Sequence, residues 1–161
     1  MERDFLKDLE LLGVTARLKR LSDELSTSIK SLYKKNGLDI ESGWHLFFLI
    51  LLERQEITMV EIANELHLSQ PAVTKMVNRM QKKGYLEVNR DEVDSRKKNL
   101  TLSKKALNEL PKFKKVWNAG KKSIRDILAS NESFLPSLEK FEIQITKMDF
   151  ENRATEYLKN D

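Results

Sequence analysis

The sequence contains no cysteine among its 161 residues, and this absence excludes several kinds of site. A disulfide framework, an iron–sulfur or thiolate zinc site and a thiol redox sensor all require cysteine side chains. Glycine and proline are scarce, with five and three residues, so we expect few long structureless loops. A hydrophobic content of 40% with 34% charged residues, over this length, is typical of one soluble, helix-rich domain with a real core.

The sequence also has no apolar run long enough to cross a membrane. Its longest run, residues 44–52 (WHLFFLILL), is far shorter than the roughly 20 residues that a membrane-spanning helix needs. Residues 1–10 (MERDFLKDLE) show no hydrophobic signal-peptide region. We therefore expect no membrane partner and a cytoplasmic location.

Motifs of catalysis and metal binding are missing as well. There are only two histidines, His45 and His67, and they are far apart in the sequence. Neither a glycine-rich phosphate loop nor a G-x-S-x-G nucleophile motif occurs. We expect no enzymatic activity, no catalytic residues, no metal site and no cofactor.

Positive charge is concentrated in one segment. Between Ser69 and Lys105 ten lysines and arginines stand against four acidic residues, so this segment carries a net charge of +6 while the whole chain carries +4. A basic segment on a near-neutral body is the distribution expected of a protein that binds phosphate backbones. Basic helices are also common as solvated surfaces, so charge alone does not establish such a function.

Long amphipathic patterns predict helices in the first third of the chain. The spacing predicts a helix over residues 13–35, with a shorter helical piece before it, at residues 4–12. The apolar residues of the long helix recur at steps of three and four: Val14, Leu18, Leu21, Leu25, Ile29 and Leu32. A second helix is predicted over residues 41–53, and since apolar residues cover all its sides we expect it to be buried.

Residues 58–83 predict two short helices joined by a tight turn. Thr58 followed by Glu61 fits a capping box, and Ser69 is a good N-cap for the second helix, over about residues 70–83. Val73, Met76, Val77 and Met80 share one face of that helix. The opposite face carries polar and basic residues: Pro71, Thr74, Lys75, Asn78, Arg79 and Lys82. This pattern is typical of a helix-turn-helix.

Two strands and two helical regions follow. Residues 85–88 (YLEV) and 99–102 (NLTL) alternate like the strands of an antiparallel hairpin. Ser103 is expected to cap a long helix that reaches about residue 129, with Pro111 kinking or restarting it. A last helical region is predicted over residues 135–158, with a break near Asp149.

The order helix-turn-helix, strand, charged turn, strand is that of a winged helix. From residue 38 to 106 the sequence resembles the MarR (multiple antibiotic resistance regulator) family of bacterial transcription factors. The resemblance rests on EIANELHLSQPAVTKMVNRMQKKGYLEV and on the wing motif DSRKKNLTLS, where Ser103 stands in place of the commoner Thr. It implies a mainly α fold with a small two-stranded wing. It also implies a winged helix-turn-helix lobe at 38–106 and a helical dimerisation region at 1–37 and 107–161.

The predicted recognition helix suits the major groove of double-stranded DNA. Free N–H groups at its N-terminus, near Ser69, Gln70 and Pro71, favour a phosphate or a base edge. The candidates for base contact are Gln70, Thr74, Lys75 and Asn78, whereas Arg79 is expected to contact the DNA backbone. The alternative is an ordinary amphipathic helix with a solvated outer face.

The resemblance also assigns roles in the wing. It implies that Arg96 enters the minor groove, with Asp94 holding its guanidinium, since a narrow minor groove concentrates negative potential. Arg90, Lys97 and Lys98 would then flank the phosphates. The pair of Asp94 and Arg96 could instead only stabilise the turn.

The resemblance finally implies partners. A homodimer would place two recognition helices about 34–36 Å apart on a pseudo-palindromic operator. The terminal helices carry more apolar residues than one small domain needs, although these could form an internal core: Phe134, Leu135, Leu138, Phe141, Ile145 and Tyr157.

Many members of this family release DNA when a small aromatic effector binds. Trp44, His45 and Phe48 lie where such a pocket would be, although aromatic residues at helical spacing are more often core. The alternative function is a winged-helix module that contacts proteins without reading DNA sequence.

Overall fold

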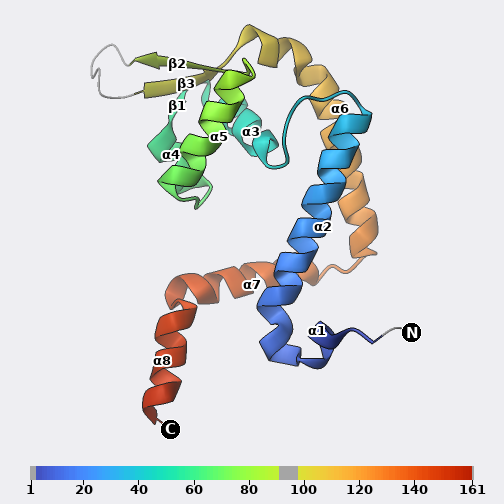
Figure 1. Cartoon of the computed structure of the whole chain (residues 1–161), viewed down its shortest axis with the longest axis vertical. Coiled ribbons are helices and arrows are strands. Elements are labelled where there is room, and N and C mark those ends of the chain that lie inside the picture. The colour runs from blue at the N-terminus through green and yellow to red at the C-terminus, as the bar shows by residue number, and fades with distance from the viewer. Residues whose placement is uncertain (1–2, 91–97, 161) are drawn as a thin grey trace. The chain divides into compact units, whose positions relative to one another are not determined.

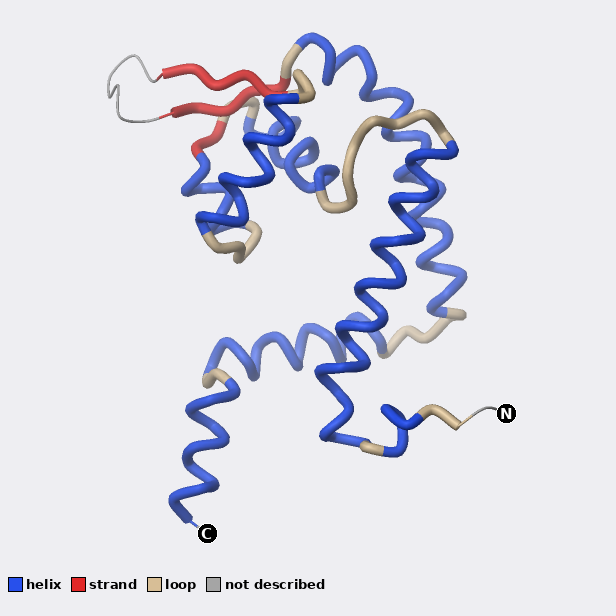
Figure 2. Tube along the Cα trace, in the orientation of Figure 1, coloured by secondary structure: helices blue, strands red, loops and turns tan. Residues whose placement is uncertain are grey.

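The computed structural model describes residues 3–90 and 98–160 (Figure 1). It divides into two compact units, Met1–Asn118 and Ala119–Asp161. Helices make up most of both units, and the three strands lie together in the first (Figure 2). The prediction of a mainly α fold with a small antiparallel wing is confirmed. None of the helices within the described ranges is both long and apolar enough to cross a membrane.

The first unit begins with the predicted short helical piece and the long helix. The short piece comprises α1 (Phe5–Asp8) and a 3-10 turn (Glu10–Gly13). Helix α2 (Val14–Lys35) follows the predicted amphipathic stripe and ends before Gly37, whose φ of +62° is a left-handed conformation that glycine adopts without strain.

Helix α3 (Trp44–Arg54) is shorter than predicted and buries one wide side rather than its whole surface. It begins at Trp44 because Gly43, with φ of +90°, stands in a left-handed conformation that a helix cannot continue through. Trp44, Phe47 and Phe48 are fully buried. Leu46 and Leu49 are 39% and 48% exposed, so the expectation of burial on all sides was wrong for the single chain.

The sheet has three strands in the order β1-β3-β2, all antiparallel: β1 (Ile57–Thr58), β2 (Leu86–Arg90) and β3 (Lys98–Leu102). The predicted hairpin is β2 and β3, in a register that sets Val88 opposite Leu100. Strand β1 was not predicted, because two residues are too few to show an alternating pattern. It pairs Ile57 with Leu100 and so connects the wing to the start of the helix-turn-helix.

The helix-turn-helix consists of α4 (Met59–Glu65) and α5 (Gln70–Lys82), close to the predicted ranges. Thr58 and Glu61 form the predicted capping box: the Glu61 N–H donates to Thr58 Oγ1 at 3.2 Å, and the Thr58 N–H donates to Glu61 Oε2 at 2.8 Å. The cap fixes where α4 begins, directly after β1.

Helix α6 (Lys104–Leu128) begins directly after Ser103, as predicted, and runs through Pro111 without a restart. Figure 1 shows it bending in its first half, as a proline inside a helix causes. One of its buried residues, Phe113, belongs to an aromatic cluster with Phe48 and Tyr85. The centroids of these three rings lie 5.3–5.8 Å apart. Edge-to-face contacts of this kind stabilise the core of the first unit.

The second unit holds the end of α6 together with α7 (Phe134–Lys147) and α8 (Phe150–Asn160). The predicted break near Asp149 is confirmed, since the Asp149 carboxylate accepts a 2.8 Å hydrogen bond from the Asn152 N–H at the start of α8. Helix α7 has no buried residue within this chain.

Candidate nucleic-acid interface

Helix α5 is attached to the first unit by one face and exposes the other. Val73, Val77 and Met80 are 0% exposed and belong to the hydrophobic core. The residues predicted to face outward are all exposed: Gln70, Pro71, Thr74, Lys75, Asn78, Arg79 and Lys82. The amphipathic pattern therefore fixes the rotation of the helix about its own axis, which decides which side chains a partner can reach.

The N-terminus of α5 is open to an anion. Ser69 precedes it in an extended conformation, and its hydroxyl accepts a hydrogen bond of 3.4 Å from the Ala72 N–H. Ser69, Gln70 and Pro71 are all exposed. Pro71 in the first turn costs the helix no hydrogen bond, because a backbone N–H at this position has no acceptor inside the helix.

Two lysines contribute positive charge to the outward face. Lys75 and Lys82 are exposed and take part in no ion pair within the described ranges. Both remain available to phosphate groups.

The base of the wing is fastened to the C-terminal end of the helix-turn-helix. The Ser103 hydroxyl donates a 2.6 Å hydrogen bond to the Gly84 carbonyl and accepts one of 3.1 Å from the Ala106 N–H. The Ser103 N–H donates to the Tyr85 carbonyl at 3.0 Å. One residue thus caps α6, closes the hairpin and holds it beside the turn after α5.

The remaining predicted DNA contacts belong to residues 90–98. Arg90 and Lys98 are opposite each other at the outer end of β2 and β3, and the Lys98 side chain is exposed. Asp94, Arg96 and Lys97 lie outside the described residues, so their assigned roles stay predictions.

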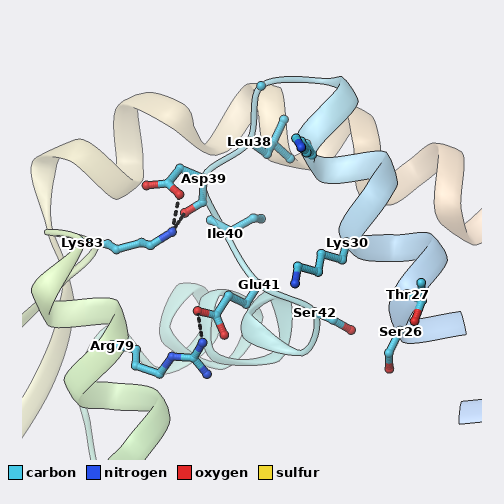
Figure 3. A pocket seen from close by; sticks show the side chains of 12 residues that line it. Ser26, Thr27, Lys30, Leu38, Asp39, Ile40, Glu41, Ser42, Arg79 and Lys83 are labelled. Atoms are coloured by element: carbon cyan, nitrogen blue, oxygen red, sulfur yellow. Dashed lines mark hydrogen bonds and ion pairs between the residues drawn. The ribbon is translucent and has the colours of Figure 1, made fainter. Parts of the chain in front are cut away.

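Two cations at the end of α5 are held by acids from the segment before α3, a pairing that sequence analysis missed. Arg79 Nη2 lies 2.6 Å from Glu41 Oε1, and the Lys83 ammonium pairs with the Asp39 carboxylate (Figure 3). The partners are 38 and 44 residues apart in the sequence, and no periodic pattern links them. These four side chains line a pocket of about 730 Å³ between α2, residues 37–42 and α5.

The three residues predicted to line an effector pocket are placed differently from one another. Trp44 and Phe48 are fully buried in the aromatic core. His45 is half-buried, and its ring centroid is 6.2 Å from that of Trp117. Its Nδ1 atom is buried without a hydrogen-bond partner among the described residues, and burial lowers the pKa of its imidazole. None of the three lines the pocket beside Arg79.

No group of three or more histidine, aspartate or glutamate side chains within the described ranges could hold a metal ion. The chain contains no cysteine that could add a ligand.

Comparison with known proteins agrees with this geometry. Residues 38–97, which contain the helix-turn-helix and the charged turn of the wing, match the model of the MarR family. No curated protein matches the sequence. A MarR protein from Peptoclostridium difficile is 22% identical, with a TM-score of 0.68, and the match covers 100% of this chain and 99% of that one.

Two further solved structures have the same fold. The protein AbfR in its reduced form, solved bound to DNA, is 19% identical with a TM-score of 0.70, and the match covers 88% of this chain and 98% of AbfR. The transcriptional regulator SlyA is 16% identical with a TM-score of 0.66, covering 83% of this chain and 92% of its own. Identities this low establish the fold and leave the chemistry to the residues of this chain.

Proposed function

Because this chain belongs to the MarR family, we propose that it is a homodimeric transcriptional regulator that binds a pseudo-palindromic sequence in double-stranded DNA. The family consists of regulators rather than enzymes. One observation carries the proposal: α5 is held by three fully buried side chains while its polar and basic face is wholly exposed. We place the protein in the cytoplasm, because the DNA that such a regulator binds lies there.

The exposed face has the chemistry of base readout. Gln70 and Asn78 carry amides that can bond an adenine edge in two places, and Thr74 can contact a thymine methyl or a polar edge. Lys75 adds a cation that can reach a guanine or a phosphate. In the proposed complex these side chains read sequence, while Arg79 and the wing residues Arg90, Arg96, Lys97 and Lys98 contact the backbone or the minor groove, with Asp94 orienting Arg96.

Exposed apolar side chains support the dimer. Leu18, Leu21 and Leu25 on α2 are 39–54% exposed, although they form one amphipathic stripe. In the second unit Phe134, Leu135, Leu138, Phe141, Ile145 and Tyr157 are all exposed, between 37% and 69%. Stripes of this size on single chains mark association surfaces, and two-fold pairing is the commonest way to cover them. We assign residues 1–37 and 107–161 to dimerisation and 38–106 to DNA binding.

A small aromatic effector that releases the DNA is the second part of the proposal. The buried Nδ1 of His45, which has no hydrogen-bond partner among the described residues, can bond a polar group on such a molecule, and Trp117 lies beside it. Trp44 and Phe48 would form the apolar wall behind them. Since Trp44 and Trp117 are the only tryptophans, a ligand at His45 would change the intrinsic fluorescence of the protein.

Selection of bound sequences from a random DNA pool tests the function. The proposal predicts enrichment of an inverted repeat whose half-sites are centred one helical turn apart, about 10 base pairs. A pool that stays random after repeated selection would contradict sequence readout. It would favour the alternative, a winged-helix module that contacts only proteins.

A further inference from the structure

Arg79 and Lys83 lie at the flank of α5, beside residues 39–42, rather than at the centre of its outward face. At 100° per residue Asn78, Lys82, Lys75 and Arg79 follow one another round the outward face, with Arg79 at its edge and Lys83 a further step of about 40° beyond. Figure 3 shows both flanking cations reaching towards the segment before α3. There Glu41 accepts from Arg79, and Lys83 contacts both the carboxylate and, at 3.3 Å, the main-chain carbonyl of Asp39.

The two acids are presented by an anchored backbone. Leu38 and Ile40, which alternate with them, are each 5% exposed and belong to the core of the first unit. The Leu38 N–H donates to the Tyr33 carbonyl at 2.9 Å, and Lys112 Nζ donates to the Gly37 carbonyl at 2.8 Å. The Trp44 N–H donates to the Glu41 carbonyl at 3.2 Å, so the backbone that carries Asp39 and Glu41 is held on both sides.

We propose that Asp39 and Glu41 restrain the affinity of α5 for DNA by competing with phosphates for Lys83 and Arg79. This inference rests on the proposed function. It assigns the two acids a role in setting affinity, through cations that they neutralise.

The physical reason is that a phosphate must either displace the carboxylate or bind next to it. The Arg79 side chain is 51% exposed and its partner Glu41 30%, so a phosphate can reach the guanidinium from the open side. Displacement costs the ion pair, and binding beside it leaves two negative groups close together. In both cases Arg79 contributes less to DNA binding than a free arginine would. Lys83, 34% exposed, is restrained by Asp39 in the same way.

The test compares Glu41→Gln and Asp39→Asn with the wild-type dimer on its selected operator. Each variant removes one negative charge while keeping a side chain of the same size. If one additional cation is free to displace counterions, log Kobs against log salt becomes steeper by about 0.9, and the affinity near 0.1 M salt rises about five- to tenfold. Glu53→Gln, at an exposed acid on α3, gives the same change in net charge without touching α5.

A double-mutant cycle separates competition from a general effect of charge. Adding Arg79→Gln to Glu41→Gln should remove the gain in affinity, since no cation is left to release. A gain no larger than that of Glu53→Gln, or one that survives loss of Arg79, overturns the inference. A loss of affinity in Glu41→Gln also overturns it, because Glu41 would then be positioning Arg79 for DNA. If the wild type binds no DNA, both the proposed function and this inference fail. If the wild type binds its operator and the variants bind it with the same affinity, the proposed function stands and only this inference fails.

Discussion

The hydroxyl of Ser103 donates a 2.6 Å hydrogen bond to the carbonyl oxygen of Gly84. Ser103 is the last residue before α6, and Gly84, with φ of +75°, lies between α5 and β2. Since the same hydroxyl caps α6, one side chain couples the end of the recognition helix, the base of the wing and the start of the long helix. The placement of the wing relative to α5 therefore depends on a residue that is not among the predicted DNA contacts.

Replacing Ser103 by alanine should lower the free energy of unfolding by about 1–2 kcal/mol, since it removes a helix cap and leaves the Gly84 carbonyl without this donor. Urea denaturation at fixed protein concentration measures it. Ser133→Ala is the control, because Ser133 occupies the N-cap of α7 without a side-chain bond to that helix. An equal loss in both variants would contradict the special role of Ser103.

Arg96→Ala should weaken DNA binding by about 1–3 kcal/mol, because it removes the arginine that the resemblance assigns to the minor groove. The protein should keep its helical content, measured by far-ultraviolet circular dichroism. Titration of labelled operator at physiological salt gives the affinity. Wild-type affinity in this variant would show that the wing does not contact DNA through Arg96.

Phe141→Asp should dissociate the proposed dimer, because it buries a charge in the apolar surface of α7. Phe141 is 47% exposed in the single chain and shares its helix face with Leu138. Sedimentation at micromolar concentration should give a monomer for this variant. Lys140→Asp, on the opposite face of α7, should remain a dimer. A wild-type monomer in the same experiment would refute the dimer altogether.

The stability of the protein should fall as the pH drops below the ordinary histidine pKa of about 6.5. Burial lowers the pKa of His45, so between its unfolded and folded pKa values the unfolded chain binds the additional proton. The free energy of unfolding, measured by urea denaturation at a series of pH values from about 7.5 down to 5.5, should show this loss of stability. His45→Gln should flatten the profile, and His67→Asn, at the exposed histidine, should leave it unchanged. A wild-type profile as flat as that of His45→Gln would contradict the assignment.

Periodicity and capping residues predicted most of the local structure. The stripes of α2 and α5, the capping box at Thr58 and the cap at Ser103 are local patterns, each encoded within a few residues. Strand β1 was missed because two residues carry no alternation. Helix α3 begins later than predicted because Gly43 has a left-handed conformation, and its start at Trp44 coincides with the start of the apolar run.

The outward face of α5 was also predictable, because burying one side of an amphipathic helix exposes the other. The pairs of Arg79 with Glu41 and of Lys83 with Asp39 were not. They join side chains that only the tertiary fold brings together, so a reading of local patterns treats these acids as part of an ordinary loop.

The central claim is that the exposed face of α5 reads DNA sequence, and the most direct test is the discrimination between operator and random duplex. The affinity ratio is measured for the wild type, for Asn78→Ala and for Asn64→Ala, which removes the same amide from an exposed position on α4. The account predicts a wild-type ratio of at least about 10³. It predicts that Asn78→Ala reduces the discrimination by about 1–3 kcal/mol while Asn64→Ala retains it. Equal ratios in all three proteins would contradict readout by Asn78, and a wild-type ratio near one would contradict the claim itself.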